Sequence, residues 1–125
     1  EAKTHGADDA IMLDVDGRVA EASTANIFVH VDGVWQTPPL DVGILGGITR
    51  QTIIDLLRAN KIEIREKILW PEDLHRAEEI FLCSSLREIV PVARLGDRVM
   101  QQQEKCKTVM ALYQQYVERL AKEPW

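Results

Sequence analysis

Two Asp-Gly pairs constrain the fold of the first third of the chain. They are Asp16-Gly17, within "AIMLDVDGRVAEAS", and Asp32-Gly33, within "NIFVHVDGVWQT". A two-residue hairpin turn needs φ > 0 at both central residues, and Asp-Gly accepts that conformation readily. Pro38 and Pro39 end the last strand-like run, because neither can donate a hydrogen bond to a sheet. The sequence therefore predicts two antiparallel β-hairpins in this region.

Two later segments carry apolar residues at helical spacing. In "GITRQTIIDLLRANK" the residues placed mostly on one face are Ile48, Ile53, Ile54 and Leu57. Asn60 is a suitable stop for this helix. The stripe in the tail consists of Val109, Leu112, Tyr113, Tyr116, Val117 and Leu120. We therefore predict one amphipathic helix after the glycine pair and another in the tail.

Short apolar segments between these helices predict further strands. The alternation in "IEIREKI" indicates a half-buried strand, and "EIFLCSS" indicates a buried one. Two more short strands are expected in "EIVPVARLGDRVM" around Gly96, and Pro71 opens a short helix in "PEDLHRA". The opening "EAKTHG" is typical of a last helical turn closed by Gly6. A single mixed α/β (α+β) domain over residues 1–125 follows, with antiparallel hairpins plus helices.

Charge and composition exclude several classes of protein. The chain of 125 residues fits one domain, and its formal net charge of −5 argues against nucleic acid or an acidic membrane as main partner. No apolar run approaches the length of a membrane span. Cys83 and Cys106 are too few for a disulfide framework, so we expect reduced thiols in a cytoplasmic protein. The spacing of the three histidines does not suit a metal site.

Two features could carry chemistry, and each also has a plain structural interpretation. Glu21 stands near the end of the second predicted strand, where a solvated glutamate is the commoner case. Gly46 and Gly47 precede a predicted helix whose first-turn amides would form a phosphate site. A simple glycine turn, with Thr49 as the helix cap, fits the same residues equally well.

The serines at the end of "EIFLCSS" are a third candidate. The hydroxyls of Ser84 and Ser85, with the amides that follow, could donate to an anion or could satisfy their own backbone. Cys83 has no histidine near it in the sequence, so a core cysteine is the simpler interpretation. No nucleophile with an adjacent base is evident.

Taken in order, these residues resemble a known family signature. The series is Glu21, Asn26, Phe28, Thr37 and Gly47-Ile48-Thr49-Arg50, and it continues through "EIFLCSSLREIVPV". It closely resembles the signature of the class IV (fold-type IV) pyridoxal-phosphate enzymes, which include branched-chain and D-amino-acid aminotransferases and aminodeoxychorismate lyase. The resemblance extends from the first residue to about Val99. It implies a D-amino-acid aminotransferase-like C-terminal domain and pyridoxal 5'-phosphate (PLP) as cofactor.

The resemblance implies a role for each candidate residue. Glu21 would pair with the protonated pyridine nitrogen of PLP, and a neighbouring carboxylate favours that charged form, which is the better electron sink. The other implied contacts are Gly47 with the Ile48 and Thr49 amides at the phosphate, Leu45 on the ring, Ser84 and Ser85 near the phosphate, and the backbone of Ser85 and Leu86 toward the substrate carboxylate. Asn26 would be structural.

The family's catalytic lysine is expected well upstream of Glu21, farther than the twenty residues that precede it here. Lys3 is the only upstream lysine, and it falls in the predicted last turn of a helix. The small N-terminal domain of the family is also missing. We therefore expect the C-terminal half of an enzyme, with no Schiff-base lysine and no turnover by itself.

Three functions remain open from the sequence. The first is an aminotransferase that exchanges an amino group between an amino acid and a 2-oxo acid, as a homodimer in its complete form. The second is aminodeoxychorismate lyase, and the third is a non-catalytic domain. Gly46 replaces a proline common in the family, and "EASTAN" and "SSLRE" lean toward the D-amino-acid aminotransferase and lyase branches.

Overall fold

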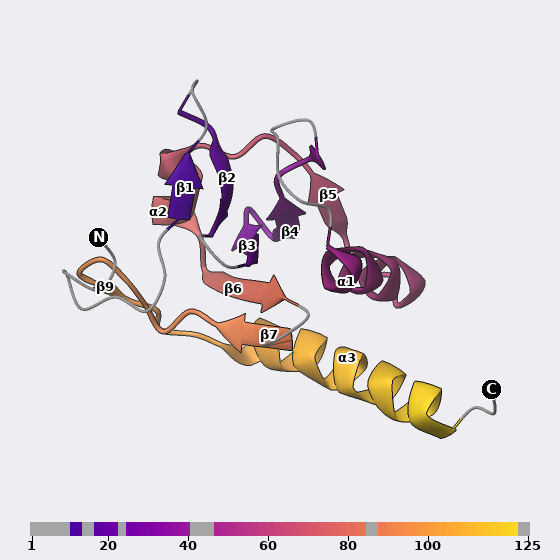
Figure 1. Cartoon of the computed structure of the whole chain (residues 1–125). Helices are drawn as coiled ribbons and strands as arrows, with labels where there is room; N and C mark the ends of the chain where they lie inside the picture. The colour runs from indigo at the N-terminus through magenta and orange to yellow at the C-terminus, as the bar shows by residue number, and fades with distance from the viewer. Residues whose placement is uncertain (1–10, 14–16, 23–24, 41–46, 85–87, 123–125) are drawn as a thin grey trace.

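The computed structural model describes residues 11–13, 17–22, 25–40, 47–84 and 88–122 (Figure 1). Along the chain the elements are β1 (Ile11–Leu13), β2 (Val19–Ala22), β3 (Asn26–Val31), β4 (Val34–Thr37), α1 (Ile48–Ala59), β5 (Ile64–Glu66), α2 (Pro71–Arg76), β6 (Glu79–Ser84), β7 (Glu88–Pro91), β8 (Arg94–Leu95), β9 (Arg98–Val99) and α3 (Glu104–Lys122). The predicted mixed α/β class is confirmed. The helix expected to end at Gly6 lies outside the described residues.

A five-stranded sheet in the order β5-β4-β3-β6-β7 forms the centre of the fold (Figure 1). β3 pairs antiparallel with both β4 and β6, and β6 pairs antiparallel with β7. β5 runs parallel to β4, because α1 connects the two strands as a crossover. The pairs β1–β2 and β8–β9 form two further small antiparallel sheets.

The glycines of the predicted turns have the conformation that those turns need. Asp32 and Gly33 have φ of 54° and 80° between β3 and β4. Gly17 has φ of 83° between β1 and β2, and Gly96 has φ of 60° between β8 and β9. β4 ends at Thr37, immediately before the two prolines. The hairpins predicted from local sequence are therefore confirmed.

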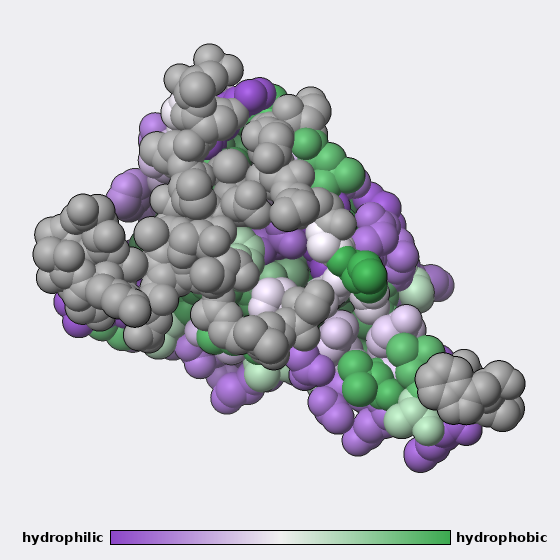
Figure 2. Space-filling view, in the orientation of Figure 1, coloured by the Kyte–Doolittle hydropathy of each residue, from purple (hydrophilic) through white to green (hydrophobic). Residues whose placement is uncertain are grey.

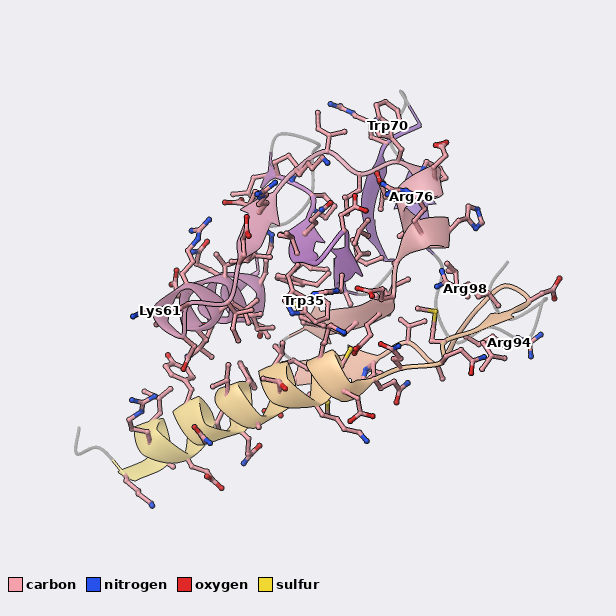
Figure 3. All side chains as sticks on the ribbon, turned by 180° about the vertical axis from the view of Figure 1, so that it is seen from behind. Trp35, Lys61, Trp70, Arg76, Arg94 and Arg98 are labelled. Atoms are coloured by element: carbon pink, nitrogen blue, oxygen red, sulfur yellow. The ribbon has the colours of Figure 1, made fainter. Side chains whose placement is uncertain are left out.

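Both faces of the central sheet are covered, so its middle strands are buried along their length. Val29 and Ile80 lie in a core cluster on one face, together with Leu74 of α2. On the other face Phe28 stacks on Phe81, with ring centroids 4.8 Å apart, and these rings share a core with α1 and α3. This second core includes Trp35, labelled in Figure 3. Burial on both faces fits the consecutive apolar residues Ile27, Phe28 and Val29 in β3.

Helix α1 lies where predicted, but one residue of its predicted face is wrong. Ile53, Ile54 and Leu57 are completely buried, whereas Ile48 is 82% exposed. At about 100° per residue, Ile48 stands about 180° around the helix from Leu57. The buried face is therefore narrower than predicted, and Ile48 marks the surface at the start of α1.

Helix α3 begins in the core and then extends beyond the sheet (Figure 1). Cys106 and Val109 near its start are buried, whereas Leu120 near its end is 49% exposed. Figure 2 shows hydrophobic side chains among hydrophilic ones on this projecting part. In the part of the chain that the structure describes, no helix combines the length and apolar character needed to cross a membrane.

The β8–β9 hairpin is fastened to α2 by an arginine. Arg98, labelled in Figure 3, donates hydrogen bonds to the carbonyls of Leu74 and His75 near the end of α2 and of Ala77 at its C-cap. A cation at this end also complements the helix dipole. Arg98 therefore holds the hairpin and α2 in a fixed relation.

Candidate functional site

Helix α1 starts with a half-buried Gly47 followed by the exposed Ile48. Gly47 is the N-cap, with φ −63° and ψ 152°, and no described side chain forms a cap hydrogen bond with it. The first turn contains no acidic residue. Because the first amides of a helix lack an intrahelical acceptor and carry the positive end of its dipole, this end suits an anion. The alternative with Thr49 as cap is wrong, since Thr49 is a buried residue inside α1.

Protein carboxylates occupy the corresponding ends of α2 and α3. At α2 the backbone N–H of Trp70 donates to Asp73 Oδ2 at 2.8 Å. At α3 the fully buried carboxylate of Glu79 accepts from the amides of Lys105 and Cys106 at 2.9 and 2.8 Å. Among the described helices, only α1 begins without a carboxylate contributed by a described residue.

Polar side chains of β3 and β4 shape the backbone around the start of α1. A Cβ atom added to Gly47 would lie 3.2 Å from Asn26 Oδ1, which is closer than an ordinary contact. Thr37 Oγ1 donates to the Ile27 carbonyl at 2.7 Å and ties the end of β4 to β3. One structural unit therefore contains Asn26, Thr37 and Gly47, which only the family resemblance had connected.

Arg50 completes this unit, although the family signature that contains it implied no role for it. Its side chain is 1% exposed, and Nη2 donates to the Pro38 carbonyl at 3.0 Å and to Glu66 Oε1 at 2.8 Å. Glu66 also lies 3.9 Å from Arg58 at the other end of α1. The sequence signal that could have identified this role is the position of Arg50 at the end of the "GITR" run. Arg50 connects α1, the chain after β4, and β5.

Ser84 lies at the same end of the sheet as Asn26. Asn26 of β3 pairs with Cys83 of β6, so Ser84 follows directly after that pair. Ser84 is half-buried and pairs with Glu88 of β7. Since Asn26 borders Gly47, the start of α1 and the end of β6 lie on one side of the molecule.

The other predicted site residues are described only in part. The backbone of Glu21 lies in β2 and pairs with Met12 of β1, as the predicted hairpin requires. Its side chain is outside the described part of the structure. Leu45, Ser85 and Leu86 also fall outside the described residues. The site roles of these four residues therefore remain predictions.

Both cysteines are free, buried thiols whose pKa is raised. Burial raises the pKa of Cys83 to about 12, against a smaller lowering by Arg50. Burial, and next the hydrogen bond and charge of Glu79, raise the pKa of Cys106. A nucleophilic cysteine needs a lowered pKa, so the predicted core role of Cys83 agrees with its surroundings.

Comparisons with known proteins agree with this arrangement. The family model described as amino-transferase class IV matches residues 1–95. The chain is 40% identical over 115 residues to the branched-chain-amino-acid aminotransferase of Escherichia coli (strain K12). That alignment covers 92% of this chain and 37% of the E. coli protein, so the chain spans little more than a third of this relative.

Solved structures show the same fold. An aminotransferase from Brucella abortus bound to PLP matches with a TM-score of 0.88 and 36% identity, over 92% of this chain and 41% of that chain. A protein from Legionella pneumophila, named as a candidate 4-amino-4-deoxychorismate lyase, matches with a TM-score of 0.86 and 30% identity, over 91% and 43% of the two chains. The chain therefore belongs to the class IV aminotransferase family.

Proposed function

We propose that this chain forms the phosphate-binding part of a PLP-dependent aminotransferase, within its C-terminal domain. The observation that carries the proposal is the start of α1, where the half-buried Gly47 and the exposed Ile48 come first and no described carboxylate caps the helix. Family membership supplies the anion, because PLP carries a phosphate and the Brucella abortus relative binds PLP. The donors fit this group, since backbone amides at a helix start are suited to phosphate.

In this proposal each residue binds or orients a different part of the cofactor. The amides of Ile48 and Thr49 hold the phosphate, and Gly47 lets the backbone approach it. Glu21 faces the ring nitrogen and Leu45 packs on the ring. Ser84 and Ser85 donate near the phosphate, and the backbone of Ser85 and Leu86 receives the substrate carboxylate. When bound, PLP supplies the electron sink for chemistry at the substrate α-carbon.

We infer a branched-chain amino acid and a 2-oxo acid as the substrates of the complete enzyme. Support comes from the Escherichia coli relative, which is named a branched-chain aminotransferase and is 40% identical. The Legionella pneumophila protein with the lyase name is 30% identical. The comparisons therefore do not favour the lyase alternative, toward which "EASTAN" and "SSLRE" lean.

We also propose that the complete enzyme is a cytoplasmic homodimer. Sedimentation of that enzyme would test its oligomeric state.

Titration of this chain with PLP tests the proposal directly. We expect saturable binding without the absorbance band of a Schiff base in the active site, and much weaker binding of pyridoxal, which lacks the phosphate. Inorganic phosphate should compete with PLP, because both would use the same amides. Equal affinity for PLP and pyridoxal, or no binding of either, would contradict the proposed phosphate site and favour a purely structural domain.

A further inference from the structure

We propose that Arg50 is a positioning residue that holds the first turn of α1 in the orientation needed to bind the cofactor phosphate. This inference rests on the proposed function and extends it to a residue that points away from the solvent. Arg50 itself would not touch the ligand. It would act through the backbone amides of Ile48 and Thr49, which come just before it in the same helical turn.

Arg50 forms a hydrogen bond to the chain just after β4, and this bond links the two ends of the connection between β4 and α1. One guanidinium nitrogen, Nη2, donates to the Pro38 carbonyl at 3.0 Å, and Pro38 follows directly after β4. The segment between Pro38 and Arg50 is therefore closed by a hydrogen bond between its two ends. Gly47, just before α1, borders Asn26 of β3, which restricts the backbone at a second point.

The second contact of Nη2 attaches this closure to the sheet. Glu66 Oε1, at the end of β5, accepts from the same nitrogen at 2.8 Å. Because Arg50 is 1% exposed, its charge is withdrawn from water and depends on this carboxylate and carbonyl. Arg50 Nε is buried without a hydrogen-bond partner among the described residues, and both of the hydrogen bonds described above come from Nη2. Such a buried, two-acceptor contact restricts orientation more than an exposed ion pair does.

A purely structural ion pair is the competing explanation, and α1 itself offers the matched control. Arg58 lies at the other end of α1 and approaches the same carboxylate, with Nη2 3.9 Å from Glu66 Oε2. Its side chain is 54% exposed. Arg50→Met and Arg58→Met therefore remove the same charge from the same helix and the same partner, but only Arg50→Met breaks the bond to Pro38.

The first measurement needs no ligand. The Gln51 amide donates to the Gly47 carbonyl at 3.2 Å and reports on the first turn of α1. We expect Arg50→Met to speed hydrogen exchange of the Gln51 amide by about tenfold or more, while amides in the middle of β3 keep their rates. Arg58→Met should leave the Gln51 rate within about twofold of the unchanged chain. Equal effects of the two variants would overturn the positioning role.

The second measurement compares PLP with pyridoxal in the unchanged chain and in each variant. Arg50→Met should reduce PLP affinity by about tenfold or more and pyridoxal affinity much less, because a misplaced first turn affects only the phosphate. Arg58→Met should preserve the PLP-to-pyridoxal ratio. A ratio unchanged in folded Arg50→Met would overturn the inference while leaving the proposed function intact. If the unchanged chain fails to discriminate PLP from pyridoxal, the proposed function fails, and the role of Arg50 in phosphate binding fails with it.

Arg50→Lys guards against a variant that does not fold. Lysine keeps the charge but replaces the planar fork with one compact ammonium on a shorter reach. We expect faster Gln51 exchange and a loss of PLP affinity of about threefold, between those of the unchanged chain and Arg50→Met. Recovery of both measurements by lysine would support the positioning role, since an ammonium can still donate to the Pro38 carbonyl and to Glu66. Slow Gln51 exchange together with a lost preference for PLP would overturn it.

Discussion

Helices α1 and α3 contribute to the same side of the core, yet they begin in opposite surroundings. At α3 the amides of Lys105 and Cys106 bind the buried carboxylate of Glu79. At α1 the first turn follows Gly47, with the exposed Ile48 beside it and no acidic residue in the turn. Amides withdrawn from water need an acceptor from the protein, whereas amides near the surface can bind a ligand. The same property of a helix start thus stabilises the fold at α3 and, in our proposal, binds the cofactor at α1.

The thiol of Cys106 shows what an occupied helix start implies for reactivity. A free helix N-terminus lowers the pKa of a nearby cysteine and makes it reactive. At α3, burial and the Glu79 carboxylate raise the pKa of Cys106 instead. A helix start that holds a buried carboxylate therefore does not make this thiol reactive.

The largest expected effect comes from removing the Glu79 carboxylate from the start of α3. Glu79→Ala leaves two buried amides without an acceptor and removes the partner of the helix dipole, so we expect a loss of about 3 kcal/mol in the free energy of unfolding. Urea unfolding followed by circular dichroism measures it. Glu78→Ala is the matched control, because Glu78 is 48% exposed and bonds only to His30 among the described side chains. An equal loss in both variants would contradict the special role of the buried cap.

Adding a carboxylate to α1 tests the comparison from the other side. Gly47→Asp should place an anion on the amides proposed for the phosphate, and we expect PLP affinity about tenfold below that of Gly47→Asn. The asparagine variant is the control, since both residues are good helix caps and both bring a Cβ close to Asn26. Calorimetric titration with PLP, repeated with pyridoxal, gives the affinities. Equal PLP affinities of the two variants would place the phosphate elsewhere.

The smallest expected effect concerns the buried thiol beneath α1. Burial raises the pKa of Cys83 from its ordinary value of 9.0 to about 12. Because the folded-state pKa is the higher one, this stabilising contribution is complete below about pH 9 and is lost as the pH rises toward about 12. Between about pH 8 and about pH 10 we expect the unchanged chain to lose about 1 kcal/mol more unfolding free energy than Cys83→Ala. Parallel pH profiles of the two chains would contradict it.

Local sequence was sufficient for much of the fold. The Asp-Gly pairs predicted hairpin turns because positive φ is a property of the turn residues themselves, and Asp32 and Gly33 show it. The start of α1 at Gly47 followed from glycines before an apolar period. Ile48 was misplaced, because an apolar residue at a helix start fits the pattern whether or not a neighbouring element covers it. Site residues inferred from the family signature, such as Glu21, remain predictions.

The sequence by itself determined the turns, the starts of α1 and α2, the burial of β6 and the family. Only the tertiary structure decided which polar groups meet. Glu79 bonds to amides 26 and 27 residues away, and Arg50 reaches a carboxylate 16 residues away. Backbone conformation depends on neighbours in the chain, so local sequence encodes it. The partner of a buried charge depends instead on how strands and helices pack, which brings together residues that no local pattern connects.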